Sequence, residues 1–242
     1  MKLNNVIIFS MNRAAQLDLL LTSIKQYAPW MWPPTILYRS TSDLFDVGYS
    51  ILADEHQIGL MYQLPLKEKL LAAIDRLVPF TTMLCDDSVF FRALPEIPWL
   101  QPETAYATHL GKNCTYSYPV NKPQKEGELD FLTSWGIDGH IYRTDDLTAC
   151  LHAVEFSTPN KLEEAMGQAA RPLKLLYADH SSMVTIPANV VQHEFPNRSA
   201  GGSVGELNGR YLAGERLDLD AMDFSNVIGG HQEIPFVWKH KG

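Results

Sequence analysis

The chain of 242 residues contains no long apolar run and only three cysteines. No stretch reaches the ~18 apolar residues of a membrane-spanning helix, and the apolar N-terminal segment is too short for a signal peptide. Cys85, Cys114 and Cys150 are far apart, and neither zinc-motif spacing nor a disulfide framework is present. We therefore expect a cytoplasmic protein with reduced thiols and no transmembrane segment.

Positive charge is also scarce. Lysine and arginine number 20 against 28 acidic residues, which gives a net charge of −8, and the sequence has no basic run. Generic nucleic-acid binding depends on a basic surface and is therefore not expected. The chain lacks GxxxxGK[ST] and HExxH, and no GxGxxG follows its first predicted strand. P-loop, zinc-protease and dinucleotide-binding functions are thereby disfavoured.

Short apolar segments alternate with segments of helical periodicity. β-Branched and apolar runs predict strands at 6–9, 35–38, 58–62, 81–85 and 183–186. Helical spacing of apolar residues predicts helices at 14–27, 42–54, 66–77, 145–154 and 161–170. This order predicts an α/β fold with a mostly parallel central sheet and helices on both faces. Residues 111–128 and 197–214 are predicted to be loops, the second a mobile loop over a site.

Polar residues follow three of the predicted strands. Right-handed crossovers would bring Ser10–Arg13, Tyr38–Arg39 and Asp86–Asp87 to one edge of the sheet. Ligands of open α/β sheets bind at that edge, beyond the carboxyl ends of the strands. No linker separates two regions, so we expect one domain over 1–242 with a Rossmann-like first half and an irregular C-terminal half.

The adjacent acids Asp86 and Asp87 are the most informative motif. Two carboxylates side by side repel each other unless a cation lies between them, and a hard divalent metal ion is a natural occupant. The alternative is that the pair forms a turn or caps a helix.

The segment Phe9–Leu17 after the first strand and the segment Leu84–Ser88 after the fourth resemble nucleotide-sugar-dependent glycosyltransferases of the GT-A fold, family 2-like. The resemblance covers residues 6 to about 239. It implies a GT-A-like sheet with a nucleotide-binding half (1–100) and an acceptor-binding half (101–242). It also implies a nucleotide-sugar donor, a hydroxyl-bearing acceptor and a divalent cation, Mn²⁺ or Mg²⁺, held by a DxD-type motif. This chain departs from that motif, because Cys85 stands where the first aspartate is expected.

The resemblance assigns roles to several of these residues. Asp87 is the expected metal ligand and Asp86 a ribose-binding or supporting residue. His231, in the segment Gly229–Gly230–His231, is the expected second ligand, and the glycines would let the backbone approach a diphosphate. The alternative for His231 is an ordinary loop histidine.

The nucleotide end of the predicted site would be lined by Ser10, Asn12, Arg13 and Arg39. A planar guanidinium suits a phosphate group. Asn12 and Arg13 could instead begin the first helix, and Arg39 could be an ordinary surface arginine.

An inverting transferase of this kind needs a carboxylate that accepts the proton of the acceptor hydroxyl. Glu163 or Glu164, near the start of a predicted helix, has the placement that the resemblance implies for this base, and Asp138 is a second candidate. The glutamates could instead complement a helix dipole, and Asp138 could be a turn aspartate before glycine. A retaining reaction would need no such base, and the stereochemistry stays open.

These residues predict a metal-dependent glycosyltransferase. One alternative is a sugar nucleotidyltransferase, although Ser10–Arg13 lacks the glycines usual in its phosphate loop. Another is a non-catalytic nucleotide- or glycan-binding module on a degenerate transferase fold, which the incomplete aspartate motif favours.

Overall fold

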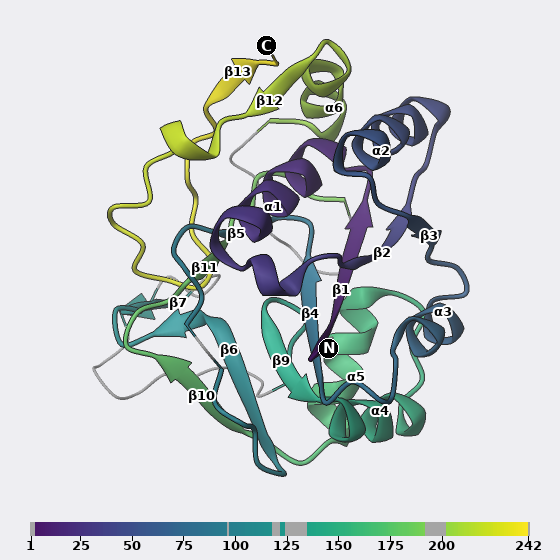
Figure 1. Cartoon of the computed structure of the whole chain (residues 1–242), viewed down its shortest axis with the longest axis vertical. Coiled ribbons are helices and arrows are strands. Elements are labelled where there is room, and N and C mark those ends of the chain that lie inside the picture. Colours follow the sequence, from purple (N-terminus) through teal and green to yellow (C-terminus); the bar gives the residue numbers. More distant parts are fainter. Residues whose placement is uncertain (1–2, 96, 118–121, 124–134, 192–201, 242) are drawn as a thin grey trace.

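The computed structural model describes residues 3–95, 97–117, 122–123, 135–191 and 202–241. A seven-stranded sheet forms the centre, in the order β10-β6-β9-β4-β1-β2-β3 (Figure 1). In chain order its strands are β1 (Asn4–Met11), β2 (Thr35–Arg39), β3 (Leu60–Tyr62), β4 (Phe80–Cys85), β6 (Thr104–Gly111), β9 (His140–Arg143) and β10 (Lys174–Ala178).

Most neighbouring strands of this sheet are parallel. β1 pairs in parallel with β2 and β4, as do β2 with β3 and β6 with β10. Only β9 runs antiparallel, between β4 and β6. The predicted α/β class with a mostly parallel sheet is therefore confirmed.

Helices cover both faces of the sheet, as predicted (Figure 1). Successive residues of β1 point to opposite faces, and this alternation creates two cores. Val6 and Ile8 pack with α1 (Ala14–Tyr27) and α2 (Asp43–His56). Ile7 and Phe9 pack on the other face with α3 (Leu66–Ala73), α4 (Thr144–Ala153) and α5 (Pro159–Ala169). The continuous apolar run of β1 therefore reflects burial on both faces.

Shorter elements form a third core against α1. They comprise β5 (Ser88–Phe90) paired with β11 (Met183–Thr185), β12 (Glu215–Leu217) paired with β13 (Trp238–His240), and the 3₁₀ helix η2 (Leu219–Ala221). Leu19, Val184 and Leu217 are among the buried residues of this core. The helix α6 (Val204–Leu212) and the 3₁₀ helix η1 (Pro29–Met31) pack instead into the core around α1 and α2. Within the described ranges, no helix has the length and apolar character needed to span a membrane.

The predicted irregularity of the second half is wrong in part, because residues 101–242 supply β6, β9 and β10 to the central sheet. The predicted loop at 197–214 is also wrong where it is described, since α6 occupies most of it. The Ser203 hydroxyl accepts a hydrogen bond from the Glu206 amide and caps α6, and Leu207 and Tyr211 are buried one turn apart. Residues 197–201 lie outside the described part.

Two smaller corrections concern other segments. The helix predicted over 66–77 ends at Ala73, in α3. The predicted loop 111–128 contains a short antiparallel pair, β7 (Tyr116–Ser117) and β8 (Lys122–Pro123), while 118–121 and 124–128 are not described.

The register of the sheet places the polar strand ends together. Phe9 pairs with Cys85, and Met11 pairs with Arg39. The segments that follow β1, β2 and β4 therefore lie at one edge of the sheet, as the sequence predicted.

Candidate functional site

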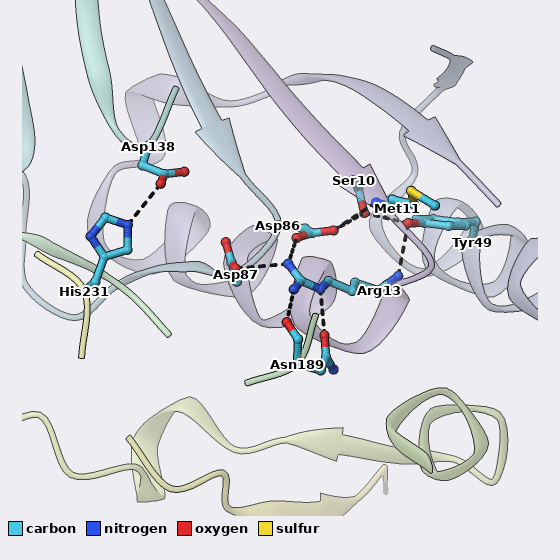
Figure 2. Close-up of polar contacts among 9 residues, drawn as sticks. All are labelled: Ser10, Met11, Arg13, Tyr49, Asp86, Asp87, Asp138, Asn189 and His231. Atoms are coloured by element: carbon cyan, nitrogen blue, oxygen red, sulfur yellow. Dashed lines mark hydrogen bonds and ion pairs between the residues drawn. The ribbon is translucent and has the colours of Figure 1, made fainter. Parts of the chain in front are cut away.

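Asp86 ties the end of β4 to the turn between β1 and α1 (Figure 2). Its Oδ2 accepts hydrogen bonds from the Ser10 hydroxyl at 2.8 Å and from the Met11 amide at 3.0 Å. Its Oδ1 accepts one from Arg13 Nη1 at 2.9 Å. Ser10 also hydrogen bonds to the Tyr49 hydroxyl at 2.6 Å. Asp86 and Ser10 are buried, so both belong to an internal network that shapes this turn.

Asn12 joins the same turn to the end of β2. Its φ of +57° lies in the left-handed region, which asparagine tolerates better than most residues. Its side-chain amide donates to the Thr41 hydroxyl at 2.8 Å and accepts from the Thr41 amide at 2.9 Å. The backbone amide of Asn12 donates to the Arg39 carbonyl at 3.1 Å. In this arrangement the Asn12 side chain holds two loops together.

Arg13 is the cation between the two adjacent acids. Its Nη1 lies 2.9 Å from Asp86 Oδ1 and 3.0 Å from Asp87 Oδ2. Asn189 holds the rest of the guanidinium, through Oδ1 at 2.7 Å from Nε and through its backbone carbonyl, which accepts from Nη2. Burial lowers the pKa of Arg13, but Asp86 and Asp87 outweigh burial and raise it overall. The repulsion expected between the acids is therefore relieved by a residue of the chain itself.

Asp87 is less enclosed than Asp86, since 15% of its side chain is exposed against 4%. Figure 2 shows it between Arg13 and the pair formed by Asp138 and His231. The pKa of Asp87 is raised to about 6, first by burial and also by the charges of Asp86 and Asp138, against the lowering effect of Arg13 and His231. Asp87 is therefore a partly exposed carboxylate whose ionisation is sensitive to nearby charge.

Asp138 and His231 form an ion pair, with His231 Nε2 3.1 Å from Asp138 Oδ2. Burial alone would raise the pKa of Asp138, but the hydrogen bond and charge of His231 lower it to about 2. Burial lowers the pKa of His231, and Asp138 outweighs this effect and raises it. Both shifts favour the charged pair.

Local backbone geometry sets the position of this ion pair. The Gly139 amide, next to Asp138, donates to the Met83 carbonyl at 2.9 Å, and its φ of +75° favours glycine. On the other side, a bridge between Thr185 and His231 holds the histidine beside β11. A Cβ on Gly230 would lie 2.6 Å from His109 Cδ2. Gly230 therefore makes room for His109.

Glu163 extends from α5 toward Asp138. Its Oε1 accepts a hydrogen bond from the Ile137 amide at 3.4 Å. Its pKa is raised to about 7, first by burial and also by the charge of Asp138, against the lowering effect of His231. Glu164 is exposed and accepts a hydrogen bond from Gln168 at 3.1 Å. Of the two candidate glutamates, only Glu163 lies at this site, and the first turn of α5 contains no acid.

Arg39 ends β2 at this edge, half-buried, with no ion pair inside the described part of the chain.

Sequence reasoning missed Asn189, His109 and His140. The rings of His109 and His140 lie 5.0 Å apart, and those of His109 and His231 lie 6.2 Å apart. Burial lowers the pKa of His140 to about 4 and that of His109 well below its usual value, so both imidazoles are neutral near pH 7. No spacing signal in the sequence connects these histidines, because they come from separate strands.

A divalent cation fits this site only with help from a ligand. Within the described residues, no group of three or more His, Cys, Asp or Glu side chains is arranged to hold a metal ion. Asp87 contributes one partly exposed carboxylate, and His231 is engaged with Asp138. Mg²⁺ and similar ions often bind through one or two carboxylates plus substrate phosphates. The donor set therefore fits a cation that arrives with a diphosphate.

Comparison with known proteins does not extend this assignment. A scan against protein-family models and a search of curated proteins both found no match to this chain.

Proposed function

We propose that this protein is a glycosyltransferase that moves a sugar from a nucleotide diphosphate donor to a hydroxyl acceptor, with Mn²⁺ or Mg²⁺ as cofactor. The observation that carries the proposal is the row of charged groups at the carboxyl edge of the sheet. Arg13 and Asp87 lie at one end of this row, and Asp138, His231 and Glu163 at the other. Ligands of open α/β sheets bind at this edge.

At the donor end, positive groups would bind the anionic leaving group. Arg39 is a half-buried guanidinium suited to a phosphate oxygen. Arg13 contributes a second positive charge at this end while its nitrogens stay bonded to Asp86, Asp87 and Asn189. Asp87 would hold the cation, and His231 could join it by exchanging its hydrogen bond with Asp138. When bound, the cation would stabilise the charge that develops on the departing diphosphate. Ser10, Asn12 and Asp86 would act indirectly, by fixing the turn that carries Arg13.

At the acceptor end, Glu163 would accept the proton of the attacking hydroxyl. A base works best when its pKa lies near the working pH, and burial brings Glu163 to about 7. Asp138 is held ionised by His231 and is a weaker base, so it suits orientation of the acceptor or stabilisation of positive charge.

The first test is titration calorimetry with UDP and GDP, each with and without Mn²⁺. We expect nucleotide binding that strengthens with Mn²⁺, and we expect Asp87→Asn to remove this strengthening. Asp179→Asn is the matched control, because Asp179 is exposed and pairs only with Lys112 among the described residues. Donor turnover that persists unchanged in excess chelator would contradict the role of the metal.

A second candidate function is a non-catalytic binding module for a nucleotide or glycan. The bridge from Arg13 to both acids favours it, since a positive charge already lies between the acids without a metal. Metal-independent binding of a bare glycan, with no donor hydrolysis, would support the module over the enzyme.

A further inference from the structure

Each of the three nitrogens of the Arg13 guanidinium donates to an acceptor within the protein. Nη1 contacts both Asp86 and Asp87, Nε donates to Asn189 Oδ1 at 2.7 Å, and Nη2 donates to the Asn189 carbonyl. Only 8% of Arg13 is exposed. A long side chain so enclosed loses most of its rotamer freedom, so its position is set by these partners.

Asn189 reaches this position from a segment 176 residues away in sequence, just beyond β11. It is 4% exposed, and its Nδ2 has no hydrogen-bond partner among the described residues. Rotating the amide by 180° would place Nδ2 against the Nε–H of Arg13, donor against donor. The orientation of the amide is therefore determined by Arg13, even though its own nitrogen is left unsatisfied.

We infer that Asn189 is a positioning residue, which fixes the Arg13 guanidinium so that a single nitrogen, Nη1, bridges Asp86 and Asp87. The guanidinium is rigid and planar, so two hydrogen bonds on Nε and Nη2 determine where the third nitrogen points. In the free protein this arrangement places one positive charge between the two acids. That this arrangement presents Arg13 to a donor diphosphate rests on the proposed function. The positioning of the guanidinium by Asn189 does not.

The test is hydrogen exchange of the Arg13 Nε–H, followed by nitrogen-15 NMR and assigned by its absence in Arg13→Lys. Asn189→Leu removes the side-chain acceptor at similar volume, and we expect exchange to become about tenfold faster, as for loss of an ordinary hydrogen bond to a charged donor. Asn189→Asp keeps an oxygen at the same place and should retain slow exchange. Asn189→Ser, which is too short to reach Nε, replaces the leucine variant if that variant fails to fold.

Asn113→Leu is the matched control. Asn113 also joins distant segments, through hydrogen bonds to Ser181 and to the Val227 carbonyl, but it does not contact Arg13. Slow exchange in Asn189→Leu, or equally fast exchange in Asn189→Asp, would overturn the inference. So would acceleration in the Asn113 control as large as in Asn189→Leu.

A second measurement separates this inference from the proposed function. UDP affinity in the presence of Mn²⁺ should fall about tenfold in Asn189→Leu, because the donor then meets a guanidinium that is no longer fixed. If wild-type protein binds no nucleotide, the proposed function fails while the exchange result still decides the role of Asn189. If UDP binds and the leucine variant binds it equally well, Arg13 is positioned for stability of the free protein alone, and its presentation to the donor is refuted.

Discussion

Replacing Arg13 by methionine would leave two adjacent carboxylates without their cation. The pair of Arg13 and Asp86 is nearly inaccessible, with 9% and 4% of the side chains exposed. Removing one partner of such a buried pair costs about 3–5 kcal/mol, because the remaining charge stays buried without compensation. This is a large part of the total stability of about 5–15 kcal/mol typical of a domain.

The loss of stability caused by Arg13→Met should depend on pH. Burial already raises the pKa of Asp87 to about 6, with Arg13 acting against that rise. Without the guanidinium the folded-state pKa of Asp87 should rise further. A carboxyl whose pKa is raised on folding destabilises the fold as pH increases, so the deficit of Arg13→Met should be smaller at pH 5 than at pH 8. We expect the difference to be about 1–3 kcal/mol.

Urea unfolding followed by circular dichroism at pH 5 and pH 8 measures both quantities. Arg13→Lys is the control, because lysine keeps the positive charge but lacks the planar guanidinium. The stability of this variant should lie between that of wild type and that of Arg13→Met. If Arg13→Met lost less than about 1 kcal/mol of stability at pH 8, the ion pair would contribute no more than an exposed one, and its burial would not carry the cost. Equal losses at the two pH values would show that the carboxylates do not carry the cost.

Three other changes test the surroundings of Arg13. Gly230→Ala should destabilise by about 1–3 kcal/mol in thermal or urea unfolding, because the new Cβ would lie 2.6 Å from His109 Cδ2. Asp138→Asn removes the ion pair, whose contribution is complete between the ordinary pKa values of its two members, 3.8 and 6.5, and declines outside them as the acid protonates or the histidine loses its proton. The stability deficit of this variant should therefore be largest near pH 5 and smaller at pH 9 and at pH 2. Glu163→Gln should stabilise the protein above pH 7 and have little effect below 4.5, since burial raises the pKa of this acid, while Glu164→Gln should change neither stability nor turnover.

Each of these measurements has a contradicting outcome. An alanine at position 230 tolerated as well as Gly209→Ala, where a Cβ meets nothing within 4 Å, would show that the His109 contact relaxes freely. A pH-independent deficit in Asp138→Asn would mean that its partner is neutral in the folded protein. For Glu163→Gln, unchanged transfer rates with a donor and acceptor would remove Glu163 as the proposed base.

The sequence by itself determined the α/β class and the edge at which the polar groups gather. The continuous apolar run at 6–9 and the alternation of strands with amphipathic helices leave a two-sided sheet as the way to bury these residues. The acids after β4 follow from chain order alone, because parallel strands end at the same edge. Local signals were weaker in the second half, where strands β6 and β9 join the sheet through long-range pairing.

Only the tertiary structure decided which residues meet at that edge. The sequence predicted a cation between Asp86 and Asp87 but could not show that the chain itself supplies one. The guanidinium of Arg13 is fixed there by Asn189, which is 176 residues away in the sequence. In the same way, helical phase separates Glu163 from Glu164: Glu163 turns toward Asp138 and is half-buried, and Glu164 is exposed. Burial and neighbouring charge, which act through space, set the chemistry of these groups.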